Sequence, residues 1–312
     1  MKRRILVTAI SGNIGNGILK ILAEDCSNEL YGCDVNEIAV GMDLVKYFWK
    51  CKYAVEEGYI DELLGMCRMY KISHLIVVNE REMETVSAER KRFQKYGIKV
   101  LIQNKEVLDI CLDKYETMKF LENNGIPIPK TYLSVEEIIW EEEKRYILKP
   151  RKSNGSKGIK LINKKEDLRA EEIEESILQE YIDGNEEYTV GVFRQNGITN
   201  IIVFQRTLCS GYSYLVDLKK DKSLTKLAKK IAELFSLEGF FNIQLRKKNG
   251  KVYVFEINPR ISGTVRFRHM LGFKDVQWWL DLLDGKTLEQ YECTYDTAIG
   301  IRELNEKFLV LK

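Results

Sequence analysis

Residues Gly250–Gly263 read GKVYVFEINPRISG, and this stretch is the most informative part of the chain. Residues 252–257 are mostly β-branched or aromatic, which predicts a strand. Glu256 and Asn258 are two residues apart, so an extended backbone directs both side chains to one face. The proline that follows ends the strand, because it has no N–H to donate to the sheet. Carboxylate and amide oxygens suit Mg²⁺, so we expect a magnesium site here, beside the cation Arg260.

A second strand pattern, Phe240–Arg246, precedes this one, and Lys-Lys-Asn-Gly between them indicates a hairpin. A strict two-residue Asn-Gly turn would place Gln244 and Glu256 on opposite faces of the hairpin. A three-residue loop, with Gly250 left-handed beside a bulge, would place Gln244, Glu256 and Asn258 on one face. We favour the longer loop, because it brings three oxygen ligands together.

A candidate phosphate-binding loop lies at residues 151–158, which read RKSNGSKG. It follows a short predicted strand that ends in Lys149 and precedes another strand pattern at residues 159–162. Small residues let backbone N–H groups approach phosphate oxygens closely. A solvated hairpin loop would have the same composition. The stretch is not a Walker loop, since it lacks that pattern and lies between two strands.

Residues 177–182 read ILQEYI and form an apolar run that changes into a polar turn before a further strand pattern at Glu187–Val190. Exposed backbone between two elements can hydrogen-bond the edge of an adenine ring, and a nearby carboxylate can bind ribose hydroxyls. Alone, the segment is equally typical of an ordinary connection.

Taken together, over roughly residues 1–285, these segments resemble the ATP-grasp superfamily, and in particular its carbamoyl-phosphate-synthetase-like branch, which includes single-chain carboxylate–amine ligases. The matching pieces, in chain order, are Asp113-Lys114, Lys149-Pro150 with its Gly/Ser loop, Gln179–Ile182 with Glu187, Gln244, and Glu256–Arg260. Each piece is modest alone, but their order and spacing support one another.

The resemblance implies a role in ATP binding for several of these residues. Lys114 and Lys149 would contact the phosphates or the adenine edge, and Ser153–Gly158 would form a lid over the phosphates. The lid residues implied are Ser153, Gly155, Ser156 and Gly158. Glu180 and Ile182 would offer main-chain groups to adenine, and Glu187 would hold the ribose.

The resemblance also implies a metal site and a catalytic group. Gln244, Glu256 and Asn258 would hold two Mg²⁺ ions, which Mn²⁺ can replace. The catalytic residues would be Arg260, Lys149 and Arg206, with Arg260 facing the transferred γ-phosphoryl group. The surroundings of Arg206 depart from the arginine-rich pattern expected there. Gln244 is a neutral ligand where many members have an acid, so it binds metal less strongly.

The N-terminal third alternates strand and helix patterns, which predicts an α/β doubly wound parallel sheet. The expected strands are 5–9, 29–33, 75–78 and 99–101, and the expected helices are 15–23, 59–70, 83–96 and, beyond them, 107–124. His74 is expected to be a strand residue rather than a catalyst.

Three parts of the chain follow from the pattern and the resemblance. We expect a Rossmann-like domain over 1–112, an ATP-grasp domain of two α+β subdomains over 113–285, and a short tail over 286–312. The lid subdomain is expected at about 125–182, after the stiff connector Gly125–Pro129.

A rival hypothesis rests on Thr8–Gly15, which resembles the glycine turn of short-chain dehydrogenases, with Asp34 placed to bind a ribose hydroxyl. Tyr115 and Lys119 supply that family's Tyr-x3-Lys spacing. Against it, this pair follows Asp113-Lys114 directly, where a new domain begins, and the Glu/Asn/Arg strand end is left without a role. A third possibility is a nucleotide-binding but inactive ATP-grasp module.

The favoured function is an ATP-dependent ligase that activates a small-molecule carboxylate as an acyl phosphate and joins it to an amine. Arg266, Arg268 and His269 are candidates for binding an acceptor carboxylate, although a solvent-facing basic helix would look the same. A net charge of +2 gives no reason to expect nucleic acid or a membrane as a partner. Seven cysteines without a Cys-x-x-Cys, and only two histidines, favour a cytoplasmic protein with reduced thiols and no zinc. A homodimer is left open as the assembly.

Overall fold

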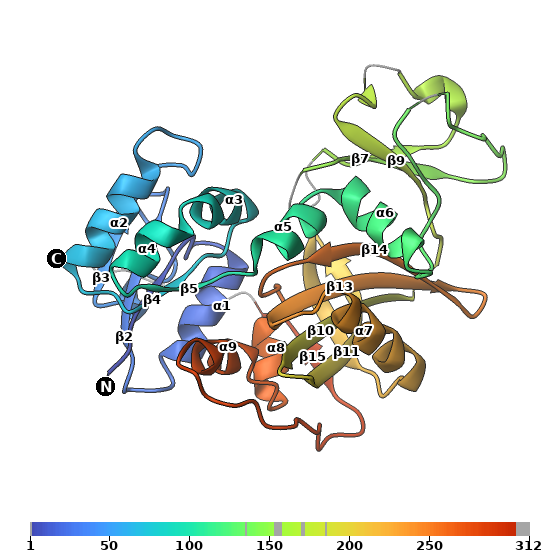
Figure 1. Ribbon diagram of the computed structural model, residues 1–312. Coiled ribbons are helices and arrows are strands. Elements are labelled where there is room, and N and C mark those ends of the chain that lie inside the picture. The colour runs from blue at the N-terminus through green and yellow to red at the C-terminus, as the bar shows by residue number, and fades with distance from the viewer. Residues whose placement is uncertain (1, 135, 153–157, 170–171, 185, 304–312) are drawn as a thin grey trace.

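The computed structural model describes residues 2–134, 136–152, 158–169, 172–184 and 186–303. Three sheets organise these residues, and Figure 1 shows the N-terminal sheet and its helices beside the other two. None of the helices in these ranges is long and apolar enough to cross a membrane.

The N-terminal sheet is parallel throughout, with strand order β3-β2-β1-β4-β5. Its strands are β1 (Arg4–Val7), β2 (Glu29–Asp34), β3 (Tyr47–Lys50), β4 (His74–Ile76) and β5 (Lys99–Leu101). The helices of this part are α1 (Asn13–Leu22), α2 (Tyr59–Met69), α3 (Glu80–Ala88) and α4 (Arg90–Lys95), with a 3₁₀ turn, η1 (Met42–Leu44). The predicted doubly wound sheet is confirmed, and His74 lies in a strand as expected.

Two predicted helices are each broken in the structure. The helix expected over 83–96 begins earlier and divides into α3 and α4. The helix expected over 107–124 divides into α5 (Lys105–Cys111) and α6 (Lys114–Asn123). The second break has a clear cause, since the Asp113 side chain accepts hydrogen bonds from the backbone N–H groups of Tyr115 and Glu116 and so begins a new helix.

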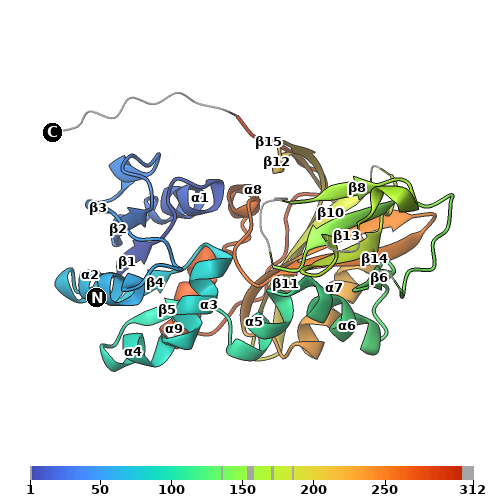
Figure 2. The same ribbon diagram turned by 90° about the horizontal axis from the view of Figure 1, so that it is seen from above.

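The remaining strands form a small and a large antiparallel sheet. The small sheet has the order β6-β9-β7-β8 and contains β6 (Thr131–Tyr132), β7 (Tyr146–Pro150), β8 (Lys160–Ile162) and β9 (Ser176–Glu180), with the 3₁₀ turn η2 (Lys165–Asp167). The large sheet has the order β14-β13-β10-β11-β12-β15 and contains β10 (Glu187–Gln195), β11 (Ile198–Cys209), β12 (Tyr212–Leu218), β13 (Gly239–Lys248), β14 (Lys251–Asn258) and β15 (Ile299–Ile301). Part of the predicted tail, β15, thus joins the large sheet beside β12 (Figure 2).

The β13–β14 hairpin corrects one prediction and confirms its consequence. Lys248 pairs with Lys251, so the turn has only two residues, Asn249 and Gly250, both with positive φ. The bulge lies within the strands instead, where Gln244 pairs with Glu256 and the next pair is Leu245 with Val254. The extra residue shifts the register by one, so Gln244 and Glu256 lie directly opposite each other on one face after all.

Each face of the large sheet packs against a different set of helices. One face packs on α5, α6 and α7 (Lys222–Leu234), and Figure 2 shows α6 and α7 together on that side. Part of the other face joins a hydrophobic core with the N-terminal sheet, α1, α8 (Val265–Met270) and α9 (Asp275–Leu283). The N-terminal domain and the large sheet therefore share one core.

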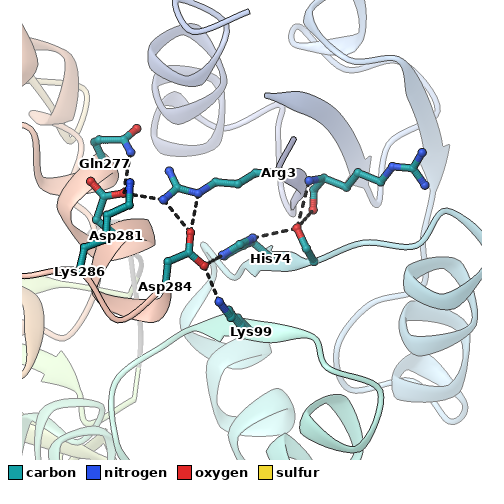
Figure 3. A network of polar contacts seen from close by, with 9 residues as sticks. Arg3, His74, Lys99, Gln277, Asp281, Asp284 and Lys286 are labelled. Atoms are coloured by element: carbon teal, nitrogen blue, oxygen red, sulfur yellow. Dashed lines mark hydrogen bonds and ion pairs between the residues drawn. The ribbon is translucent and has the colours of Figure 1, made fainter. Parts of the chain in front are cut away.

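A polar network also joins the N-terminal sheet to α9 and the residue after it (Figure 3). Arg3 donates to Asp281 at 2.5 Å and to Asp284 at 2.8 Å. His74 and Lys99 also bond Asp284, the former at 3.0 Å. Asp284 is therefore the acceptor at which β4, β5 and the residue before β1 meet the second half of the chain.

Candidate active site

One cavity of about 320 Å³ lies between the small sheet and a face of the large sheet. It gathers most of the predicted site residues that the structure describes: Lys114, Lys149, Glu180, Ile182, Glu187, Arg206, Gln244, Glu256, Asn258 and Arg260. Of the predicted lid residues, Ser153, Gly155 and Ser156 fall outside the described residues, and Gly158 lies near Pro150. The gathering is a property of the fold, since these residues come from strands of both sheets, from the segments that follow β9 and β14, and from α6.

The three residues predicted to bind metal lie on one face of the β13–β14 hairpin. Gln244 pairs with Glu256, and Asn258 is two residues further along the same strand. The amide oxygens already accept hydrogen bonds, Gln244 from Arg206 at 2.7 Å and Asn258 from Arg260 at 3.0 Å. One carboxylate and two amide oxygens facing a polar cavity form a donor set that fits Mg²⁺.

Glu187 lies between two arginines. It accepts hydrogen bonds from Arg206 at 2.9 Å and from two nitrogens of Arg246 at 3.0 and 2.6 Å. Burial would raise the pKa of Glu187, but the two guanidinium charges and their hydrogen bonds hold that pKa below its usual value. Glu187 is therefore a carboxylate at neutral pH, and a ribose would have to share its oxygens with the arginines.

Arg246 is a cavity residue that the sequence did not single out. Besides Glu187, it donates to the carbonyl oxygen of Ile182 at 2.8 Å and lies over the Tyr181 ring. It therefore ties the segment predicted to bind adenine to the residue predicted to bind ribose. Its position two residues from Gln244 on the same strand was the available signal.

Lys149 is buried at the end of β7. Its ammonium donates to Gln179 at 2.9 Å and lies 5.1 Å from the centre of the Phe255 ring. Burial lowers the pKa of Lys149 to about 8, with the Glu256 carboxylate acting in the opposite direction. A poorly hydrated cation held in a cavity is well suited to bind phosphate oxygens.

Glu180 and Lys114 are held in place through their backbones. The N–H of Glu180 donates to the carbonyl of Lys130 at 2.8 Å. The N–H of Lys114 donates to the carbonyl of Arg151 at 3.1 Å, and Arg151 in turn pairs with Asp113. The start of α6 is thereby fixed to the end of β7, which places both lysines in one cavity.

Arg260 has a partner from the N-terminal domain. Its guanidinium donates through two nitrogens to Glu80 at 3.1 and 2.8 Å and through one of them to Asn258. Glu80 is the first residue of α3, just beyond the carboxyl end of β4, where polar site residues gather in parallel sheets. The sequence analysis did not identify Glu80.

The three candidates for an acceptor carboxylate lie outside the cavity lining. Arg266 and His269 both contact Glu24, at 2.6 and 2.8 Å. Arg268 has no exposed surface, and its guanidinium is bonded to Asp275, Ser262 and Thr264. A substrate cannot reach Arg268 in this structure, which corrects that prediction.

The glycine turn of the rival hypothesis has a structural use here. The Asp34 carboxylate accepts hydrogen bonds from the backbone N–H groups of Ser11, at 2.8 Å, and Asn36, at 3.1 Å, and is itself buried. It is therefore occupied in holding the turn. Asn13 and Ile14, within the same segment and at the start of α1, line the same cavity as the predicted ATP-binding residues.

The comparisons with known proteins agree with this geometry. Residues 111–264 match the family described as an ATP-grasp domain, and residues 5–101 match the family described as a PylC-like N-terminal domain. The chain therefore has a PylC-like N-terminal domain followed by an ATP-grasp domain.

Individual relatives extend the likeness. The chain is 31% identical to a D-alanine--D-alanine ligase of Fusobacterium nucleatum over 48% of its own length and 56% of that protein. It is 23% identical to an arginine-specific carbamoyl phosphate synthase large chain of Halalkalibacterium halodurans over 74% of its own length and 24% of the other. The chain thus spans less than two thirds of either relative.

A solved structure confirms the fold over most of the chain. N5-carboxyaminoimidazole synthetase from Staphylococcus aureus, in complex with ADP, superposes with a TM-score of 0.73 at 16% identity. The superposition covers 96% of this chain and 80% of the other. The order of an N-terminal parallel sheet followed by the two ATP-grasp sheets is therefore shared.

Proposed function

We propose that the protein is an ATP-dependent ligase that joins a small-molecule carboxylate to an amine and releases ADP and phosphate. The observation that carries the proposal is the single cavity in which two lysines, the Glu187 carboxylate, the three metal-binding candidates and Arg260 meet. The likeness to a D-alanine--D-alanine ligase supports the reaction class. The cytoplasm stays the expected location, and the assembly, with a homodimer among the alternatives, stays open.

In the proposed reaction, a carboxylate oxygen attacks the γ-phosphorus of ATP, and ADP leaves. An amine nitrogen then attacks the acyl carbon, loses a proton, and phosphate leaves. Lys149 and Lys114 would hold phosphate oxygens, and Glu180 and Ile182 would place the adenine. Arg260 would stabilise the charge on the moving phosphoryl group.

Gln244, Glu256 and Asn258 would hold the Mg²⁺, which neutralises phosphate charge when it is bound. Arg206 and Arg260 would then turn from the amide oxygens of Gln244 and Asn258 toward the nucleotide. The proposed reaction requires little acid–base catalysis by the protein. In keeping with this, no histidine is among the described residues that line the cavity.

The decisive experiment measures ADP release by the purified protein across a panel of carboxylates, with hydroxylamine present to trap acyl phosphate. We expect carboxylate-dependent ADP release and a hydroxamate product, both requiring Mg²⁺. Nucleotide binding without turnover across the panel would instead support an inactive module.

A second measurement separates the ligase from the dehydrogenase hypothesis. MgADP should raise the melting temperature, because a ligand that binds only the native state stabilises it, whereas NADH should not. The reverse ranking would contradict the proposal.

A further inference from the structure

The segment Ser262–Thr264 lines the part of the cavity beside α1, which we call the acceptor end of the cavity. It follows Arg260 directly and lines the cavity together with Asn13 and Ile14 of α1. Most of the residues predicted to bind adenine and phosphates come instead from the small sheet, which Figure 1 shows away from α1 and α8. The proposed substrate carboxylate would therefore lie between Arg260 and this segment.

Arg268 is hydrogen-bonded to both ends of this segment. One guanidinium nitrogen donates to the Ser262 hydroxyl at 2.7 Å and to the Thr264 hydroxyl at 2.6 Å. The other two nitrogens donate to Asp275 at 2.9 and 2.5 Å. Arg268 and Asp275 each have 0% exposed surface, so solvent does not compete for these bonds.

The residues around Arg268 leave space for its side chain. Its guanidinium lies 4.6 Å from the centre of the Phe240 ring. A Cβ atom at Gly191 would lie 2.8 Å from the Arg268 Cδ, although the backbone of Gly191 is ordinary strand. The strand therefore omits a side chain to make room for a charge. Burying an ion pair is rarely a gain in stability, which favours a role in fixing geometry.

A second arginine, Arg302, which lies later in the chain, is hydrogen-bonded to the same segment. It donates to the Gly263 carbonyl at 2.6 Å and to the Ser213 carbonyl at 3.0 Å, and Ser213 also lines the cavity. Arg302 comes directly after β15, whose pairing with β12 sets its position. Two guanidinium groups from different elements thus hold three consecutive cavity residues.

We propose that Arg268 and Arg302 are positioning residues for the acceptor end of the cavity, acting through Ser262–Thr264 on the binding of substrate carboxylate or amine. The inference rests on the proposed function. A positioning role explains why the buried Arg268–Asp275 pair and Arg302, which follows β15, both contact the segment next to Arg260. Neither arginine lines the cavity, so neither is expected to bind the nucleotide.

The test uses the full chain with Arg302→Ala and Arg302→Lys, and Glu303→Gln as the matched control on an exposed neighbouring residue. Hydrogen exchange at the amides of residues 263–265 should quicken in Arg302→Ala. With a panel of L-amino acids as substrates, KM for the amino acid should rise roughly 10- to 100-fold in Arg302→Ala, because the segment Ser262–Thr264 would be displaced. MgADP affinity should be unchanged.

Partial recovery in Arg302→Lys is expected, since one ammonium replaces a planar group that bridges two carbonyls. If Arg268→Lys folds, it should show the same faster exchange, raised KM and unchanged MgADP affinity. If it does not fold, the Arg302 variants alone test the positioning role. Unchanged exchange at 263–265 in Arg302→Ala, or equal losses for amino acid and MgADP, would overturn the inference. Absence of turnover by the unmodified protein would count against the proposed function, while the exchange measurement still decides the positioning role.

Discussion

At the scale of single residues, the site is a set of charges that restrain one another. Arg260 contacts Glu80 and Asn258, and Arg206 contacts Glu187 and Gln244. Each arginine bridges a carboxylate and an amide oxygen of a predicted metal ligand. Nucleotide and metal would therefore bind by replacing contacts within the protein.

Arg260→Ala should lower kcat by roughly 10²- to 10³-fold, on the scale of losing one electrostatic stabiliser of a transition state. ATP affinity should fall far less, because the lysines and the adenine segment are unchanged. Steady-state kinetics with nucleotide titration would check this. Loss of ATP binding with normal single-turnover chemistry would show that Arg260 only binds.

Glu80→Gln should lower kcat by about 10-fold, because Arg260 would lose the charged partner that orients it. ATP affinity should be nearly unaffected, and Glu89→Gln, at the residue that follows the same helix, serves as the control. Equal kcat in both variants would remove Glu80 from the mechanism.

The low pKa of Lys149, about 8, makes nucleotide binding sensitive to pH. Above that pH the free protein loses the ammonium charge, so the apparent affinity for ATP should fall as pH rises from about 7 to about 9. Lys149→Met should bind ATP more weakly and lose this dependence. A variant that kept the same pH profile would assign it to another group.

At the scale of elements, the hairpin shows how one residue sets a site. The two-residue turn alone would have placed Gln244 opposite Phe255, and the bulge moves Glu256 to that position. The expected face was correct, but its cause was a bulge within the strands rather than a longer loop. Local turn signals do not reveal a bulge that depends on packing of both strands.

Gly250→Ala tests this separation of turn from site. Gly250 has φ of +74°, so a side chain there should lower the free energy of unfolding by about 1 kcal/mol. The Mg²⁺ dependence of turnover should stay the same, because the bulge is untouched. Asn249→Gly, at the other positive-φ position, should not destabilise the turn through this effect. A changed metal requirement in Gly250→Ala would mean that the turn sets the ligand face.

At the scale of the whole molecule, the two halves are joined by a shared core and by the Asp284 network. Burial would raise the pKa of Asp284, but hydrogen bonds from Lys99 and Arg3 hold it well below its usual value. A depressed carboxylate pKa contributes stability that is present above about pH 4 and is lost as pH falls below it.

Asp284→Asn should therefore lower the free energy of unfolding at neutral pH by about 1.5–3 kcal/mol, the range for hydrogen bonds to a charged group. The difference from the unmodified protein should shrink at about pH 3. Urea unfolding at both values measures it. A constant difference across this range would mean that the charge of Asp284 does not contribute.

Sequence alone determined the class of fold and several of the polar residues that line the cavity. Strand periodicity and the chemistry of strand ends are local, so Glu256, Asn258, Arg260 and Lys149 could be identified from their own neighbourhoods. The same holds for the alternation of the N-terminal domain, which the parallel sheet confirms. The roles assigned to the site residues stay predictions.

Only the tertiary structure decided which distant residues complete the site. Glu80 meets Arg260 across 180 positions, and Arg302 meets Gly263 across 39. The sequence indicates either an acceptor-binding role or a solvent-facing position for Arg268, yet this residue is buried against Asp275. These contacts depend on how sheets and helices pack, and packing joins segments whose separate sequences carry no mark of their partners.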